Sequence, residues 1–158
     1  MSSFTIETGK DNPVLRAKAK HIDRVDKSIK KLASNMIDSM KASDGMGLAA
    51  PQVGISKRIV IVLLNYNTDH EMIVPLINPE ITYFSDDAEK AEEGCLSLPG
   101  VYKQVERSTQ IRLTYTDIKG KEKMLVLEDM NARVVQHEVD HLDGILFIDR
   151  VKEQVNDA

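Results

Sequence analysis

Two histidines near the end of the chain, His137 and His141, limit its structure more than any other pair of residues. On a helix, residues four positions apart lie about 40° apart around the axis, so both imidazoles can reach one metal ion. Glu138 follows the first histidine and can hold a water molecule that is bound to such an ion. The pattern therefore predicts a helix that carries part of a catalytic metal site.

The chain has one cysteine, Cys95, whose surroundings suit a metal ligand better than a core residue. A catalytic metal site needs a third protein ligand and keeps one coordination position open. A buried free cysteine is usually a small hydrophobic residue, but Gly94 and Pro99 make residues 92–99 a poor core segment. We therefore interpret Cys95 and the two histidines as the ligand set, with Glu138 as the general base.

Length and composition predict one globular domain that spans residues 1–158. The net charge of -4 gives no general basis for binding nucleic acid or an anionic membrane. A single cysteine cannot form an internal disulfide, which favours a reducing compartment. The longest aliphatic run, residues 59–64, is far shorter than the roughly 20 residues that span a bilayer. The N-terminal residues resemble no targeting signal, so we expect a cytoplasmic protein.

Two helices are predicted from apolar residues that recur at spacings of three and four. The first is expected to have Asp23 as its N-cap and to end at residues 43–45. The second runs from about Asp129 to Leu142, with Gly144 just beyond its C-terminus. The apolar stripe of the first helix consists of Val25, Ile29, Leu32, Met36 and Met40.

Short apolar or alternating runs predict several strands, and residues 85–93 are expected to form an exposed acidic loop. Residues 117–120 are predicted to turn the chain between the last two strands and so form a hairpin. The predicted strands are 58–64, 72–78, 81–84, 101–107, 111–115 and 123–127. The expected fold is α+β, with mixed or antiparallel strands packed around the central histidine-bearing helix and one further helix near the N-terminus.

The segment 45–54 is rich in glycine and alanine, which permits close approach of another backbone. It lacks the spacing and the lysine of a phosphate-binding loop. One interpretation is a tight structural turn, and the other is a wall of a substrate cleft with Gln52 as a polar contact. The segment alone does not decide between them.

Three motifs, taken together, resemble those of the peptide deformylase family. The family has a G-x-G-x-A-A-x-Q segment, an E-G-C-L-S segment and H-E-x-x-H, in this order. They occur here, complete, at residues 45–52, 93–97 and 137–141. Residues 11–16 and 77–79 also resemble family segments, so the similarity covers nearly the whole chain.

The resemblance implies an enzyme that removes the N-formyl group from formyl-methionine at the start of new polypeptides and releases formate. It implies that the cysteine and the two histidines hold the metal, with water in the fourth position. Glu138 would accept the proton of the water and pass it to the departing amine. Gln52 and the backbone N–H of Leu96 would stabilise the oxyanion.

The ligand set suits Fe(II), Zn(II), Co(II) or Ni(II), and the resemblance favours Fe(II) as the native ion. The sequence alone does not choose the metal. The methionine side chain needs an apolar pocket, and we expect substrate contacts from Gly45, Met46, Gly47, Glu93, Gly94, Met130, Arg133 and Val134.

The chain ends soon after residues 147–150, whereas many bacterial members carry a further C-terminal helix. A short-tailed member of the family is therefore expected, such as one from a virus or phage. The expected partner is the formyl-methionyl nascent peptide, and the protein is expected to be a monomer. Docking to the ribosome is left open, because the helix that serves it in other members is missing.

Two other classes of protein remain as alternatives. A zincin-type peptidase would take its third ligand from an acidic residue after the histidines: Asp143, Asp149 or Glu153. It would keep its metal in Cys95→Ala and would cut internal peptide bonds. An inactive metal-binding module would have four protein ligands and would be indifferent to Glu138→Ala.

Overall fold

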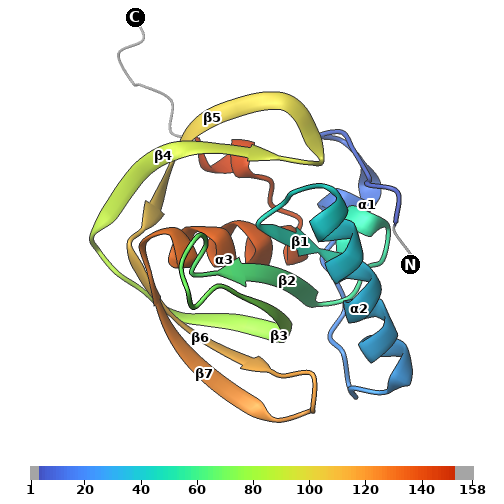
Figure 1. Cartoon of the computed structure of the whole chain (residues 1–158). Coiled ribbons are helices and arrows are strands. Elements are labelled where there is room, and N and C mark those ends of the chain that lie inside the picture. The colour runs from blue at the N-terminus through green and yellow to red at the C-terminus, as the bar shows by residue number, and fades with distance from the viewer. Residues whose placement is uncertain (1–3, 152–158) are drawn as a thin grey trace, which may run out of the picture.

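The computed structural model describes residues 4–151, in which α3 lies at the centre, with strands wrapped around it (Figure 1). The helices and antiparallel strands confirm the predicted α+β class. Among the described residues, no helix is both long and apolar enough to cross a membrane. The elements follow in this order: α1 (Pro13–Arg16), α2 (Lys27–Ala42), β1 (Gly47–Ala49), the 3-10 turn η1 (Ala50–Val53), β2 (Ile59–Leu64), β3 (Met72–Phe84), β4 (Ala88–Cys95), β5 (Leu98–Ser108), β6 (Gln110–Thr116), β7 (Glu122–Glu128), α3 (Asp129–Leu142) and the 3-10 turn η2 (Phe147–Arg150).

The larger sheet has five antiparallel strands in the order β1-β2-β3-β6-β7, and β4 pairs with β5 in a separate ribbon. Strand β2 is apolar throughout because both of its faces are covered. Val60 and Val62 pack in the cluster that includes α3, while Ile59 and Ile61 pack in the cluster that includes α2. The sheet thus lies between the two long helices.

Helix α2 begins three residues later than the sequence predicted. Its N-cap is Asp26, whose Oδ1 accepts a hydrogen bond from the N–H of Ile29 at 3.0 Å. The expected cap, Asp23, is exposed and precedes the helix. The predicted apolar stripe is otherwise buried from Ile29 to Met40, so the helix phase was correct.

Strand β3 is one strand where two had been predicted. The ladder between β3 and β6 shifts register between Ile77 and Glu80, which is where Pro79 lies. A proline lacks an N–H, and a bulge lets the strand continue past it. The prediction was wrong because proline was taken as the end of a strand.

The segment 85–93 was predicted to be an exposed loop, but most of it belongs to β4. Charges of opposite sign lie across the ladder from β5: Lys90 is opposite Glu106 in register, and Glu93 forms an ion pair with Arg107 at 2.8 Å. Such cross-strand charge pairs stabilise a ribbon without an alternating apolar pattern. The loop prediction failed because it considered the polarity of one strand alone.

The glycine-rich segment forms β1 and η1 and is followed by Gly54, which has a φ of 83°. Strand β1 lies at the edge of the sheet and contacts both α2 and α3. The predicted hairpin is present as β6 and β7, and α3 has the predicted bounds. The residues before β1 and the end of β4 line one cleft together with α3.

Candidate metal centre and substrate cleft

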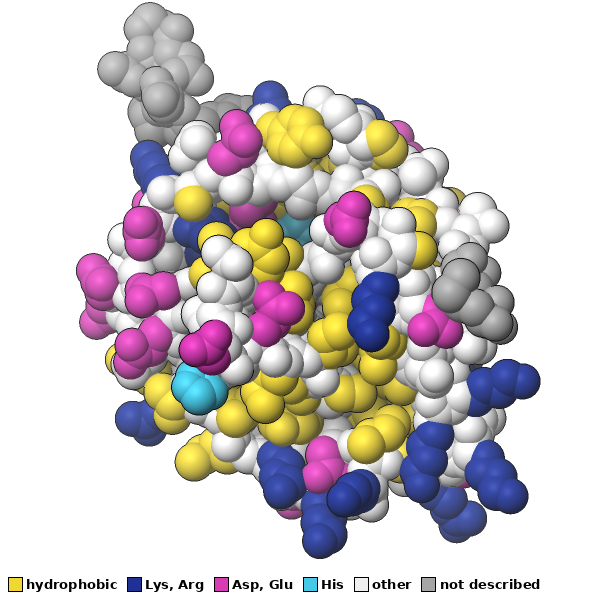
Figure 2. All heavy atoms as spheres, viewed as in Figure 1, with side chains coloured by type: hydrophobic (Ala, Val, Ile, Leu, Met, Phe, Trp, Pro, Cys, Tyr) yellow, Lys and Arg dark blue, Asp and Glu magenta, His cyan; other side chains and the backbone are white. Residues whose placement is uncertain are grey.

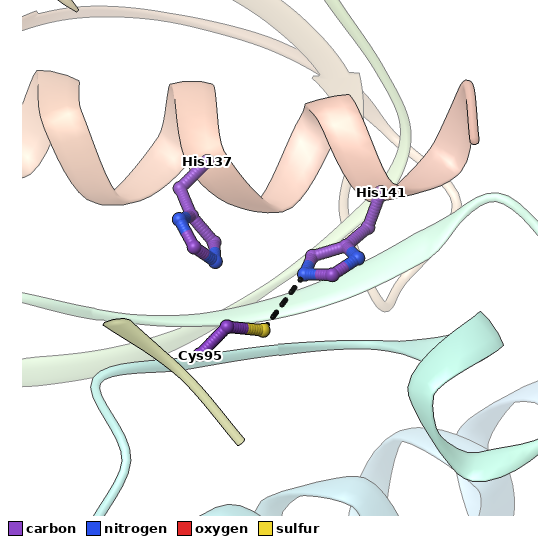
Figure 3. Close-up of side chains that lie close together, drawn as sticks. All are labelled: Cys95, His137 and His141. Atoms are coloured by element: carbon purple, nitrogen blue, oxygen red, sulfur yellow. Dashed lines mark hydrogen bonds between the residues drawn. The ribbon is translucent and has the colours of Figure 1, made fainter. Parts of the chain in front are cut away.

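The two histidines of α3 point toward Cys95, which arrives from the end of β4 (Figure 3). His137 and His141 lie one helical turn apart on the same side of the helix, with ring centroids 5.2 Å apart. The β4–β5 ladder shifts register between Glu93 and Cys95, where the chain turns toward β5. This turn presents the thiol to the helix.

The donor set fits a divalent metal ion. Among the described residues, the nitrogen and sulfur donors of Cys95, His137 and His141 form the one group of this kind, within 4.8 Å of one another. The Sγ atom of Cys95 lies 3.4 Å from Nε2 of His141. One thiolate and two imidazoles are ligands that zinc, iron, cobalt and nickel accept. Burial keeps the pKa of His141 well below its usual value, so its ring is neutral and can donate a lone pair.

A buried carboxylate orients the first histidine. Oε1 of Glu93 lies 2.9 Å from Nδ1 of His137, which leaves Nε2 to face the thiol side. Two guanidinium groups, those of Arg107 and Arg133, also contact this carboxylate, at distances of 2.6–2.9 Å. Burial alone would raise the pKa of Glu93, but hydrogen bonds from Arg107 and His137 lower it to about 2. Glu93 was predicted to contact substrate, yet its carboxylate is occupied by these three side chains.

Glu138 lies beside the triad with part of its carboxylate unpaired. It is buried, and its Oε1 has no hydrogen-bond partner among the described residues. Burial raises the pKa of Glu138 to about 7. A buried and unpaired carboxylate is costly in a structure with no function for it, and a pKa near neutrality suits a general base.

The side chain of Gln52 is held in a fixed orientation next to the thiol. Its Oε1 accepts a hydrogen bond from the N–H of Ala49 at 2.9 Å. Its Nε2 donates to Oγ of Ser97 at 3.2 Å and lies 3.4 Å from Sγ of Cys95. The amide nitrogen of Gln52 is therefore directed toward Ser97 and the proposed ligand Cys95 rather than toward solvent.

A cleft of about 680 Å³ opens in front of these groups. Figure 2 shows hydrophobic side chains over the middle of this face and acidic side chains gathered on the side of β4. The site residues predicted from sequence that line this cleft are Gly45, Met46, Gly47, Gln52, Glu93, Gly94, Cys95, Leu96, Met130, Arg133, Val134, His137 and Glu138. A larger cavity of about 890 Å³, between residues 21–25 and the β6–β7 hairpin, contains none of the triad.

The predicted side-chain pocket is partly polar. Val134 is buried, but Met130 is half exposed at the rim of the cleft. The guanidinium of Arg133 donates to the carbonyl oxygens of Val105 and Glu89 and so ties α3 to the ribbon. Only the aliphatic stem of this arginine is available to an apolar ligand.

The sequence reasoning missed the charged residues behind the triad. Arg107 is 5% exposed and Asp140 is 9% exposed, and they form an ion pair of 2.7 Å. The sequence did indicate Arg107, because it lies two residues after Val105 in a strand and therefore points to the same, buried side. An arginine on the buried side of a strand requires a buried acidic partner. The alternative acidic ligands Asp143 and Asp149 pair with arginines instead, and Glu153 lies outside the described residues.

The chain matches one known protein family over nearly its whole length. The sequence model described as polypeptide deformylase matches residues 5–157. The chain is 47% identical to a peptide deformylase of Prochlorococcus marinus over 145 residues, which are 90% of this chain and 72% of the relative. It is 45% identical to a peptide deformylase of Desulforudis audaxviator, with 88% of each chain covered.

Solved structures agree with the sequence relatives. The peptide deformylase of Thermotoga maritima superimposes with a TM-score of 0.90 at 42% identity, covering 97% of this chain and 100% of that one. A peptide deformylase of Synechococcus elongatus in complex with actinonin has a TM-score of 0.88 at 39% identity. The shared region is 96% of this chain and 80% of that structure.

Proposed function

The chain belongs to the polypeptide deformylase family, and we propose that Cys95, His137 and His141 hold its metal ion. It is an enzyme that removes the N-formyl group from nascent polypeptides and releases formate. The family is metal-dependent, and the three donors form a cluster that could hold a metal. One observation carries the proposal: the cluster lies in a cleft beside Glu138, whose Oε1 is buried and unpaired.

We propose Fe(II) as the native ion, with Zn(II), Co(II) or Ni(II) able to take its place. When bound, the ion would supply Lewis acidity that activates water and polarises the formyl carbonyl. The thiolate supports a softer ion than magnesium or calcium, which prefer oxygen ligands.

Glu138 acts as the general base and then as the general acid. It removes a proton from the attacking water and delivers it to the nitrogen of methionine as the C–N bond breaks. Burial supports this role, because a carboxylate with a raised pKa both accepts and returns a proton near neutral pH.

Gln52 and the backbone N–H of Leu96 donate hydrogen bonds to the oxyanion of the tetrahedral intermediate. This role is supported by the contacts of Gln52 with Ala49 and Ser97, which orient its amide beside the proposed ligand Cys95. Loss of one such donor typically raises the barrier by about 2.7–4 kcal/mol.

The walls of the cleft bind the substrate. Gly45, Met46 and Gly47 line it on one side and Gly94 on the other, while Met130 and Val134 offer apolar surface to the methionine side chain. We assign Glu93 and the head of Arg133 to supporting His137 and β5 rather than to direct substrate contact.

Residues 1–158 would act as one catalytic domain, as a monomer in the cytoplasm. The substrate is the formylated nascent peptide, which brings the enzyme close to ribosomes. Co-sedimentation with ribosomes would test whether the enzyme docks on them.

The first test is release of formate from a short formyl-methionyl peptide by protein purified without oxygen and loaded with Fe(II) or Ni(II). Glu138→Gln should lower kcat by about 10²–10⁴-fold while metal content stays stoichiometric. Glu80→Gln is the matched control, because it removes the same charge from an exposed position of β3. Absence of formate release from the loaded wild type would overturn the assignment, and cleavage of internal peptide bonds would support the peptidase alternative.

A further inference from the structure

The 3-10 turn η2 is linked to the proposed metal ligands in two ways, one direct and one indirect. The ring of Phe147 stacks on the imidazole of His137, with centroids 6.0 Å apart and planes 21° apart. Three residues later, Arg150 reaches Asp140 of α3 with both ends of its guanidinium. The first contact is apolar and direct, and the second begins a chain of charged groups.

Arg150 and Asp140 form a two-pronged ion pair. Nη2 of Arg150 lies 2.8 Å from Oδ1, and Nε lies 3.1 Å from Oδ2. A planar guanidinium that contacts both oxygens fixes the orientation of a carboxylate as well as its position. The pKa of Arg150 is raised, chiefly by its hydrogen bond to Asp140.

The carboxylate of Asp140 is also connected, through two further side chains, to the proposed metal ligand His137. Oδ2 of Asp140 also accepts a hydrogen bond from Nη1 of Arg107 at 2.7 Å. The remaining prongs of Arg107, Nε and Nη2, donate to Glu93 at 2.8 and 2.9 Å. Glu93 then contacts Nδ1 of His137 at 2.9 Å. Asp140, Arg107 and Glu93 thus each contact both the preceding and the following member of this series.

Only the outer end of this series reaches solvent. The side chains of Glu93, Arg107 and Asp140 are 4–12% exposed, while that of Arg150 is 47% exposed. Without Arg150, Asp140 would keep one side-chain partner among residues 4–151, Arg107, and would be free to rotate about that contact. Arg107 would keep its two hydrogen bonds to Glu93 but would lose a fixed partner at its third donor, Nη1.

We propose that Arg150 is a positioning residue that sets the orientation of the His137 imidazole through Asp140, Arg107 and Glu93. The proposal rests on the proposed function insofar as His137 is a metal ligand. Outer partners of metal ligands typically change affinity by about 10–100-fold when removed, and we expect about tenfold for this more distant residue.

A second ion pair at η2 provides the matched control. Arg16 of α1 contacts Asp149, the neighbour of Arg150, so it anchors the same turn but does not touch Asp140. Both Arg16→Ala and Arg150→Ala remove a partly exposed guanidinium that belongs to η2 or forms an ion pair with it. Only Arg150→Ala interrupts the series that leads to His137.

The test is titration of each variant with Co(II), followed by the absorption of the bound ion. Arg150→Ala should weaken Co(II) binding about tenfold and shift the ligand-field bands of the bound ion. Arg150→Lys keeps the charge but cannot contact both oxygens of Asp140 through a planar group, so it should give an intermediate shift. Arg16→Ala should keep wild-type affinity and bands, whatever its thermal stability. In formate release with saturating metal, Arg150→Ala should lower kcat at unchanged KM.

Equal Co(II) affinities and bands in Arg150→Ala and wild type would overturn the proposal. The same loss in Arg16→Ala would also overturn it, because anchoring of the turn would then be sufficient. The spectra do not depend on turnover, so a wild type that binds Co(II) but releases no formate would refute the proposed function while still testing Arg150.

Discussion

At the scale of single residues, the absence of a side chain at Gly47 leaves the room that the side chain of Glu138 occupies. A Cβ at that position would lie 2.6 Å from Oε2 of Glu138 and 2.7 Å from its Cγ. The carboxylate would have to move, and a displacement of about 1 Å in a catalytic group can cost 10²-fold in rate. We expect Gly47→Ala to lower kcat/KM for formate release by about 10²-fold while metal content stays at the wild-type level.

Gly45→Ala is the comparison for this prediction. A Cβ there would have only ordinary contacts, the nearest being 3.6 Å from the carbonyl oxygen of Gly47. It should lose much less activity than Gly47→Ala. Similar losses in both variants would show that backbone freedom of the segment matters, rather than room for Glu138.

At the scale of elements, the backbone at the end of α1 lies against the chain just after α3, and Gly144 makes this close approach possible. Its φ of 74° lies in the left-handed region, and a Cβ would collide with the carbonyl oxygen of Arg16. The left-handed conformation alone costs a non-glycine residue about 1–2 kcal/mol. We expect Gly144→Ala to lower the free energy of unfolding by more than this amount, measured by denaturant unfolding.

Gly120→Ala separates the two contributions. Gly120 has a similar φ of 85°, but a Cβ there would meet no heavy atom within 4 Å. It should therefore show only the conformational cost. Equal losses of stability in the two variants would mean that the contact with Arg16 contributes nothing.

At the scale of the whole molecule, the ion pair between Arg16 and Asp149 joins α1, early in the chain, to η2, late in it. Burial opposes ionisation of Asp149, but hydrogen bonds from Arg16 and from the N–H of Leu146 outweigh it and lower its pKa below 3.8. A lowered pKa contributes stability above the unfolded-state value, and this contribution is lost as the pH falls through the folded-state value. Asp149→Asn should therefore be less stable than wild type at about pH 7 and should approach it at about pH 2.

Urea unfolding of both proteins at several pH values checks this prediction. Leu146 donates to Asp149 in wild type, and the amide oxygen of asparagine can still accept that bond, so the comparison isolates the charge. A difference in stability that is independent of pH would contradict the ionic explanation.

The sequence alone was sufficient wherever the determining contacts are local. The bounds of α3 and the common face of its two histidines follow from spacings of three and four residues. The β6–β7 hairpin follows from alternation on both sides of a short turn. The surroundings of Cys95 predicted the third donor, and the resemblance of three motifs to one family supported it and predicted the activity.

Tertiary structure decided what depends on partners far away in the chain. The polar residues of β4 become a strand because β5 supplies opposite charges, and β3 continues past a proline because β6 accommodates a bulge. Glu93 faces His137 rather than the open cleft because Arg107 and Arg133 hold it there. A buried charge is determined by whichever counter-charges the fold brings to it, and spacing along the chain carries no record of those distances.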